Sequence, residues 1–307
     1  MLRGAIIGFG NVAQFGHWPA YQNNREARIV GVVDARPERR AVAAELALRN
    51  FERLDQLRDI DFVDICTPPA SHAEQILEAA RNGWHVLCEK PLVINSAQLR
   101  DISETNVAVV PVHNWKYAPI IHRATQLLRD GAIGTLRRVE ISVLRTQPAS
   151  STGPSWRGNA ELAGGGIVMD HGWHATYLAL HWFDEPARRV SAQLIRSGDI
   201  ETEGTVTIQF PSGSAQIALS WNAATRENRI SLTGEAGEII VDDDVLRLNG
   251  RAEQFAQKLS AGSHHPDWFA AMLPDVLAIF REPARARPVF DEAAECLRII
   301  EQAYATA

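Results

Sequence analysis

GAIIGFGNVA, residues 4–13, joins a short apolar run to a glycine-rich turn and to the start of a helical pattern. Gly4–Ile7 predicts a buried strand, and Val12–Asn23 predicts the helix after it. Gly8 permits the tight turn between the two elements, and Gly10 lets the backbone approach a phosphate at the helix N-terminus. A glycine-rich turn in this strand–helix context predicts a dinucleotide-binding fold.

An acidic residue follows where this motif requires one. Ala13 replaces the usual third glycine and still allows the helix to pack closely on the sheet. Asp34 ends the next predicted strand, Ile29–Val33, and its carboxylate can accept both ribose hydroxyls but would repel a 2′-phosphate. We therefore predict NAD as the preferred cofactor. NADP is the alternative, because three following cations could reach a 2′-phosphate: Arg36, Arg39 and Arg40. The cofactor contacts predicted from this region are Gly8, Phe9, Gly10, Asn11, Val12, Asp34, Ala35 and Arg36.

Short apolar runs and helical patterns continue to alternate through the first third of the chain. Repeated strand–helix units of this length predict a parallel sheet with helices on both faces, which is a doubly wound Rossmann sheet. The further predicted strands are Phe62–Cys66, Trp84–Cys88 and Val107–Val112, and the predicted helices between them are Pro37–Arg49, Ser71–Asn82 and Ser96–Thr105.

The pattern changes near residue 120. Ile120–Arg129 predicts one more helix, and longer strands with alternating apolar residues follow, beginning with Leu136–Thr146. They predict an α+β domain with a large, mostly antiparallel open sheet, closed by the helices Asp267–Phe280 and Asp291–Ala305. Residues 147–166 are rich in Ser, Gly, Pro and Ala and predict a long loop. We expect a dinucleotide-binding domain at 1–120 and a substrate-binding and oligomerisation domain at 121–307.

Composition and charge narrow the class of protein. The 307 residues are 46% hydrophobic and 22% charged, with a net charge of −6. Basic residues are scattered rather than gathered in a stripe, so we expect no nucleic-acid partner. No apolar run has the length of a membrane span, and no leader pattern precedes the first strand, so we expect no membrane partner. Three cysteines favour a reducing compartment over a disulfide framework, and we predict a cytoplasmic protein.

A second motif, GGGIVMDHGWH at residues 164–174, places ionisable groups directly after three glycines. Asp170 and His174 are four residues apart, so on a helix they lie on one face. The glycines let the backbone approach a cofactor without Cβ clashes. Asp170 near the helix N-terminus is favoured as an anion and can orient His174.

A third motif, CEKPL at residues 88–92, ends the predicted strand Trp84–Cys88. Lys90 therefore lies at the carboxyl edge of the parallel sheet, which is where such sheets bind their ligands. A lysine in a loop is most often a surface residue, so Lys90 alone would not indicate a site.

The ordered set of GFGNVA, Asp34, TPPASH (67–72), EKP (89–91) and GGGIVMDHGWH resembles the Gfo/Idh/MocA family from end to end. These NAD(P)-dependent oxidoreductases are named after glucose–fructose oxidoreductase and inositol dehydrogenase. The resemblance implies a catalytic group of Lys90, Asp170 and His174, and a homodimer or homotetramer formed through the C-terminal sheet. It adds Thr67, Pro68 and His72 to the cofactor site and places the Trp156–Arg157 pair near cofactor and substrate. We also predict cofactor contacts by Glu89 and Lys90, and substrate contacts by Lys90, His171 and His174. The chain departs from the family pattern at Pro69, Lys116 and Tyr177.

The chemistry of these side chains suits hydride transfer. Oxidation of an alcohol requires loss of the hydroxyl proton as hydride leaves carbon, and imidazole is an effective base near neutral pH, so His174 suits this role. Lys90 can stabilise the developing alkoxide. We predict an NAD(P)-dependent dehydrogenase or reductase that acts on a CH–OH group of a sugar, polyol or related cyclic alcohol, with Lys90 and His174 as its acid–base pair. The alternative is a sensor or regulatory protein of the same fold that binds dinucleotide without catalysis.

A metal site is a further alternative for the second motif. Asp170, His171 and His174 have spacings that can present ligands from a helix, and His264 and His265 could supply another ligand. We predict no metal, because no third ligand stands at a recognised spacing and hydride transfer to nicotinamide needs no Lewis acid.

Overall fold

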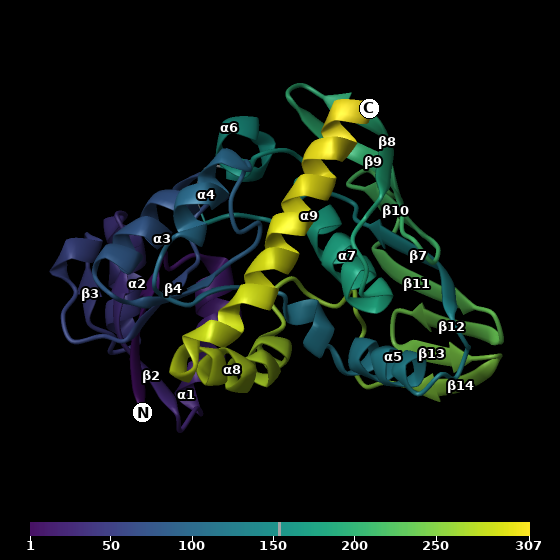
Figure 1. Ribbon diagram of the computed structural model, residues 1–307. Helices are drawn as coiled ribbons and strands as arrows, with labels where there is room; N and C mark the ends of the chain where they lie inside the picture. Colours follow the sequence, from purple (N-terminus) through teal and green to yellow (C-terminus); the bar gives the residue numbers. More distant parts are fainter. Residues whose placement is uncertain (153–154) are drawn as a thin grey trace. The chain divides into compact units, whose positions relative to one another are not determined.

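The computed structural model describes residues 1–152 and 155–307, so two positions of the predicted loop 147–166 lie outside the described residues (Figure 1). The chain forms two compact units, and each unit is assembled from three segments. The first unit contains Met1–Val112, Ser150–Trp156 and His264–Ala293. The second contains His113–Ala149, Arg157–Ser263 and Ala294–Ala307.

The first unit is built on a six-stranded parallel sheet with the strand order β3-β2-β1-β4-β5-β6. This order confirms the predicted doubly wound fold, in which the order reverses beside the first strand and leaves a crevice at the carboxyl ends of the strands. The strands are β1 Leu2–Ile7, β2 Ala27–Val33, β3 Asn50–Phe51, β4 Phe62–Ile65, β5 His85–Cys88 and β6 Val109–Pro111.

Helices connect these strands and cover the sheet. They are α1 Trp18–Gln22, α2 Pro37–Glu45, α3 His72–Arg81 and α4 Ala97–Ser103, joined by α8, Pro266–Arg281. The helix predicted over Val12–Asn23 differs in its first turns, because Ala13–His17 is a π-helical segment in which the Trp18 N–H bonds to the Ala13 carbonyl. Pro19 follows and has no N–H for a normal helical bond, which favours such a local change of helix period.

The second unit contains an eight-stranded sheet with the order β14-β13-β12-β11-β7-β10-β9-β8. Its strand pairs are antiparallel except for β7 and β10, which confirms the predicted mostly antiparallel open sheet. The strands are β7 Leu136–Leu144, β8 Arg189–Ser197, β9 Ile200–Gln209, β10 Ser214–Ser220, β11 Glu227–Gly234, β12 Gly237–Asp242, β13 Val245–Leu248 and β14 Arg251–Gln254.

One face of this sheet is covered by helix α7, Ile167–Phe183. Ile217 and Leu219 of β10 and the following residue, Trp221, are buried, and Gly172 of α7 lies directly over Leu219. α7 is apolar on nearly all sides, as expected of a helix enclosed in a core. The remaining helices are α5 Pro119–Arg129, α6 Ala160–Ala163 and α9 Ala286–Thr306. None of the helices in the described part of the chain has the length and apolarity needed to span a bilayer.

Candidate functional site

The glycine turn after β1 has the properties of a phosphate cradle. Gly8 has φ of +84°, and a Cβ there would lie 2.8 Å from the Thr67 side chain, so both conformation and packing require glycine. A Cβ on Gly10 would meet only the Thr152 hydroxyl, at 3.6 Å, among the described atoms. Gly10 is therefore not required by protein packing, and the open space beside it fits a pyrophosphate at the start of the helix.

Asp34 ties the end of β2 to this turn. Its carboxylate accepts hydrogen bonds from the Phe9 N–H at 2.8 Å and from the Arg36 N–H at 2.9 Å, and the residue is only 6% exposed. Asn11 reaches in the other direction, where its amide donates to the Ser150 carbonyl at 3.4 Å. The acid that the sequence predicts for ribose binding thus also fixes the conformation of the glycine turn.

The three arginines that could reach a 2′-phosphate of NADP contact groups of the protein itself. Arg39 is buried, and its Nε donates to the Phe9 carbonyl at 2.6 Å. Arg40 Nη1 donates to the carbonyls of Asp34 and Ala35, each at 2.8 Å. Arg36 Nε contacts the Asp34 carboxylate at 3.4 Å. Arg39 and Arg40 therefore brace the turn and the end of β2 through backbone carbonyls.

His72 joins two loops at the carboxyl edge of the sheet. Its Nδ1 lies 2.9 Å from the Pro91 carbonyl, and its Nε2 lies 2.9 Å from the Thr67 carbonyl. Burial lowers the pKa of His72, and the hydrogen bonds to these carbonyls act in the opposite direction. Thr67 donates to Gln75 at 2.6 Å. His72 thereby holds the loop after β4 against the EKP turn.

A buried polar chain ends at the EKP turn. Asp64, fully buried in β4, accepts from Tyr21 at 3.1 Å and lies 2.9 Å from Nδ1 of His17. Nε2 of His17 lies 3.1 Å from Glu89, and Glu89 accepts from the Lys90 N–H at 3.0 Å. No spacing pattern in the sequence indicates these polar contacts, because their members come from three different strand–helix units.

Electrostatics favour a cationic His17 between two carboxylates. Burial lowers the pKa of His17, but the charge of Asp64 and the hydrogen bonds of His17 raise this pKa by a larger amount. The pKa of His17 therefore lies well above its ordinary value. For Glu89, burial raises the pKa, but the bond to His17 and its charge lower it more. The stability that protonated His17 contributes is therefore fully present below its unfolded pKa of about 6.5 and is lost as pH rises through the folded pKa.

Replacing His17 by Gln and Asp64 by Asn together is expected to flatten this pH dependence. Between about pH 6.5 and about pH 8, the wild-type free energy of unfolding should fall by up to about 1.4 kcal/mol per pH unit more than that of the double variant. The double variant removes the charges of His17 and Asp64 together, so neither of these two is left buried as a lone ion, and Glu89 keeps the Lys90 N–H as a partner. Urea unfolding at several pH values measures the difference, and equal slopes for the two proteins would contradict it.

Metal-ligand side chains also meet at this position. Among the described residues, His17, Asp64 and Cys66 bring one ligand atom each within 4.8 Å of one another. Hydrogen bonds of His17 Nδ1 to Asp64, at 2.9 Å, and to Cys66 Sγ, at 3.3 Å, account for the proximity of these three side chains. The residues considered for a metal in the sequence lie elsewhere: Asp170, His171 and His174 belong to the second unit, and His264 and His265 to the first.

In the second unit, two of the three glycines of the second motif are explained by close packing at the start of α7, and the first, Gly164, ends α6 with φ of +80°. A Cβ on Gly165 would overlap the Tyr304 hydroxyl, and a Cβ on Gly166 would overlap the Glu201 carbonyl. The Glu201 carboxylate accepts from the N–H groups of Gly166, at 2.8 Å, and Val168, at 3.0 Å, and from Tyr304 at 2.9 Å. Glu201 therefore caps α7 from β9, where an anion also suits the helix dipole.

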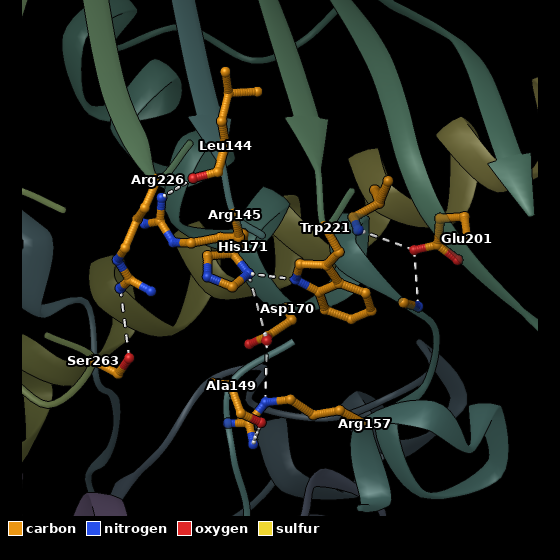
Figure 2. Close-up of polar contacts among 12 residues, drawn as sticks. Leu144, Arg145, Ala149, Arg157, Asp170, His171, Glu201, Trp221, Arg226 and Ser263 are labelled. Atoms are coloured by element: carbon orange, nitrogen blue, oxygen red, sulfur yellow. Dashed lines mark hydrogen bonds and ion pairs between the residues drawn. The ribbon is translucent and has the colours of Figure 1, made fainter. Parts of the chain in front are cut away.

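Asp170 lies in the first turn of α7, as predicted. Its carboxylate contacts Arg157 Nε at 3.2 Å and His171 Nδ1 at 3.5 Å (Figure 2). Trp221, which follows β10, directs its indole N–H to His171 at 3.4 Å. The predicted substrate residues Arg157 and His171 are thus brought together around Asp170, whereas Trp156 belongs to the first unit.

His174 lies one turn further along α7 and is buried. Its ring stacks on Trp115, with centroids 4.7 Å apart, and its Nδ1 lies 2.9 Å from the Tyr177 hydroxyl. Tyr177 also accepts from the Trp115 N–H at 3.0 Å. Tyr177, one of the departures from the family pattern, therefore orients His174, a role predicted from the sequence only for Asp170.

Two models of known protein families match the sequence of this chain, one in each half. The model described as "Oxidoreductase family, NAD-binding Rossmann fold" matches residues 2–108, and "GFO/IDH/MocA C-terminal domain" matches residues 121–240. An oxidoreductase of Formosa agariphila is 30% identical over 257 residues, which are 76% of this chain and 77% of that protein. The chain belongs to the Gfo/Idh/MocA family.

One further relative and one solved structure are similar to this chain. The inositol 2-dehydrogenase of Rhizobium meliloti is 27% identical over 79% of this chain and 76% of its own length. The crystal structure of GenD2 from gentamicin A biosynthesis, in complex with NAD, has the same fold, with a TM-score of 0.86 and 24% identity over 100% of this chain and 94% of that one. The predicted NAD(P)-dependent oxidoreductase class is confirmed.

Within this family member, each unit gathers its own share of the predicted site residues. The first unit holds Gly8, Phe9, Gly10, Asn11, Val12, Asp34, Ala35, Arg36, Thr67, Pro68, His72, Glu89, Lys90 and Trp156, and the second holds Arg157, Asp170, His171 and His174. Their roles toward cofactor and substrate stay predictions.

Proposed function

We propose that the protein transfers hydride between a nicotinamide cofactor and a hydroxyl or keto carbon of a sugar, a polyol or a related cyclic alcohol. The similarity to an inositol 2-dehydrogenase supports this substrate class. The observation that carries the proposal is the fixed imidazole of His174, which is buried, stacked on Trp115 and oriented at Nδ1 by Tyr177. A ring held in this way is prepared for proton transfer in one direction.

The proposed acid–base pair is His174 with Lys90. When bound, the cofactor accepts the hydride in the oxidative direction. When Nδ1 of His174 donates to the Tyr177 oxygen, the lone pair of the neutral ring is on Nε2, which can take the hydroxyl proton. The Lys90 ammonium donates to the same substrate oxygen and stabilises its developing charge. In reduction the proton returns along the same path.

We further propose that NAD is the preferred cofactor. The Asp34 carboxylate is held at the end of β2, where it can accept the ribose hydroxyls and repel a 2′-phosphate. Two of the three cations that could have compensated a phosphate, Arg39 and Arg40, donate to backbone carbonyls. The predicted homodimer or homotetramer stays a prediction.

Turnover of a panel of polyols and aldoses, followed by reduced-nicotinamide absorbance, tests the function and the cofactor together. We expect oxidation with NAD⁺ at a kcat/KM about tenfold or more above that with NADP⁺, because a 2′-phosphate beside Asp34 pays a like-charge cost. Asp34→Asn keeps an acceptor for the Phe9 N–H but removes the charge, so it should reduce this preference.

The same panel of polyols and aldoses distinguishes a catalytic protein from a non-catalytic dinucleotide sensor. Cofactor binding without turnover of any member would favour a non-catalytic dinucleotide sensor. A preference for NADP⁺ that is unchanged in Asp34→Asn would contradict the role of Asp34.

A further inference from the structure

Two arginines face one another where strands β7 and β11 leave the sheet. Leu144 of β7 pairs with Glu227 of β11 in the antiparallel ladder. The next residues outward, Arg145 and Arg226, therefore stand opposite each other. Like charges in this arrangement repel, so the pair needs a compensating partner.

Arg145 is the buried member of the pair. It is 2% exposed, and its Nη1 donates to the carbonyls of Leu144, at 2.7 Å, and Glu227, at 3.1 Å, and to Asn228 Oδ1 at 2.9 Å. Its Nε is buried and has no hydrogen-bond partner among the described residues. Burial, followed by the charge of Arg226, lowers the pKa of Arg145 to about 10. The guanidinium is thus held by neutral acceptors only, with donor capacity remaining.

Arg226 is the exposed member and is also held by neutral acceptors. Its Nε donates to the Ser260 carbonyl at 2.5 Å, and its Nη2 donates to the Gly262 carbonyl. Asp243 is an acid whose charge acts on both arginines, but its carboxylate accepts from the Ser260 N–H at 2.9 Å and hydroxyl at 2.7 Å. Among the described residues, neither arginine forms an ion pair with a carboxylate.

The arginines stand at the end of the sheet that lies beside the first turns of α7. The Arg145 N–H bonds to Ser220 at the end of β10, and the following residue, Trp221, contacts His171 of α7. Asp170 is close enough for its charge to act on Arg145, although its own carboxylate contacts Arg157 and His171 (Figure 2). His171 and His174 are three residues apart on α7 and so lie on neighbouring parts of one helix face.

We propose that Arg226, backed by the positive charge of the buried Arg145, binds an anionic group of the substrate, either a carboxylate or a phosphate carried by the sugar or polyol. This inference rests on the proposed function and narrows its substrate class. Guanidinium groups with free donors suit both anions, because their planar N–H groups match paired oxygens. A substrate held by its anion at this end of the sheet extends along α7 toward His174.

A purely structural role for the pair makes a different prediction. In a purely structural role, Arg145 would join the ends of β7 and β11 by donating hydrogen bonds to their carbonyl oxygens. Such a role would not require a second cation opposite Arg145. The two roles differ in the effect of Arg226, which contacts neither strand end through its side chain in the described residues.

Calorimetric titration of the full chain with glucose, glucuronate and glucose 6-phosphate tests the subsite. The three probes share a ring and differ in bearing no charge, a carboxylate or a phosphate. We expect the wild-type protein to bind one of the anionic probes about tenfold to a hundredfold more tightly than glucose, and the Arg226→Gln variant to lose this preference. Arg229→Gln is the matched control, since it removes an equal charge from β11 at a residue paired with Asp242.

Each outcome decides the inference. A preference for glucuronate or for the phosphate that disappears in Arg226→Gln but persists in Arg229→Gln supports the subsite and identifies the anion. Equal binding of all three probes, or a preference that both variants retain, overturns it. Turnover of neutral polyols without any anion preference would support the proposed function and reject the anion subsite. Anion binding that depends on Arg226 but occurs without turnover of any substrate would support the subsite and reject the proposed function.

Discussion

Replacing Lys90 with alanine is expected to lower kcat by about 10²–10⁴-fold, the range that a positioned acid–base group supplies. The lysine follows β5, where Glu89 accepts its backbone N–H and His72 holds the carbonyl of Pro91. These contacts do not involve the ammonium group, so the turn should persist in the variant. Stopped-flow measurement of hydride transfer and fluorescence titration of NADH separate the loss of chemistry from any loss of cofactor binding.

A second lysine and the residues around His174 provide the controls for this prediction. Lys258 is exposed and distant in sequence from every motif, so Lys258→Ala should retain wild-type turnover. His174→Ala should lose activity to a similar extent as Lys90→Ala. Tyr177→Phe removes the contact at Nδ1 and the acceptor for the Trp115 backbone N–H but keeps the imidazole, so it should lose less. Wild-type-like rates in Lys90→Ala or His174→Ala would reject the acid–base pair.

One signal for Lys90 was present in the composition. The chain contains only three lysines, Lys90, Lys116 and Lys258, among 31 basic residues. Arginine and lysine are not equivalent, because an ammonium group can exchange its proton near neutral pH more readily than a guanidinium. A lysine in the EKP turn of an arginine-rich chain therefore fits a role that needs a transferable proton.

The fold was predictable because its signals are local. Strand–helix alternation and the glycine turn before Val12 depend on residues within a few positions of one another, and they yielded the parallel sheet, just as alternating apolar residues yielded the mostly antiparallel one. The π-helical segment Ala13–His17 was not predicted, because its hydrogen-bond pattern depends on a proline beyond its end.

Much of the support for the candidate site could not be predicted, because it comes from distant parts of the sequence. Glu201 caps α7 across 35 residues, and His17 meets Glu89 across 72. A carboxylate in a strand or a histidine in a helix has no spacing pattern that reveals such a partner. The arginine pair was equally hidden, since Arg145 and Arg226 become neighbours only through the register of β7 and β11.

Gly166→Ala is expected to have the largest effect on stability, lowering the free energy of unfolding by about 3 kcal/mol. The new Cβ would overlap the backbone carbonyl of Glu201, which cannot rotate away as a flexible side chain could. The turn cannot shift freely either, because the Glu201 carboxylate binds the N–H groups of Gly166 and Val168. Burial and the charge of Glu201 raise the pKa of Tyr304, so its hydroxyl stays protonated and continues to donate. Urea unfolding measures the loss.

A matched glycine in the same region separates crowding from a general effect of alanine. Gly158 has no atom within 4 Å of the position of a Cβ among the described residues, so Gly158→Ala should change stability by less than about 0.5 kcal/mol. If Gly166→Ala were as stable as Gly158→Ala, Glu201 would not hold the start of α7. Because α7 carries Asp170 and His174, a displaced first turn should also lower kcat in whatever fraction of Gly166→Ala still folds. The triple glycine thus links stability to catalysis: it admits Glu201 and Tyr304, and these fix the helix that presents the proposed base.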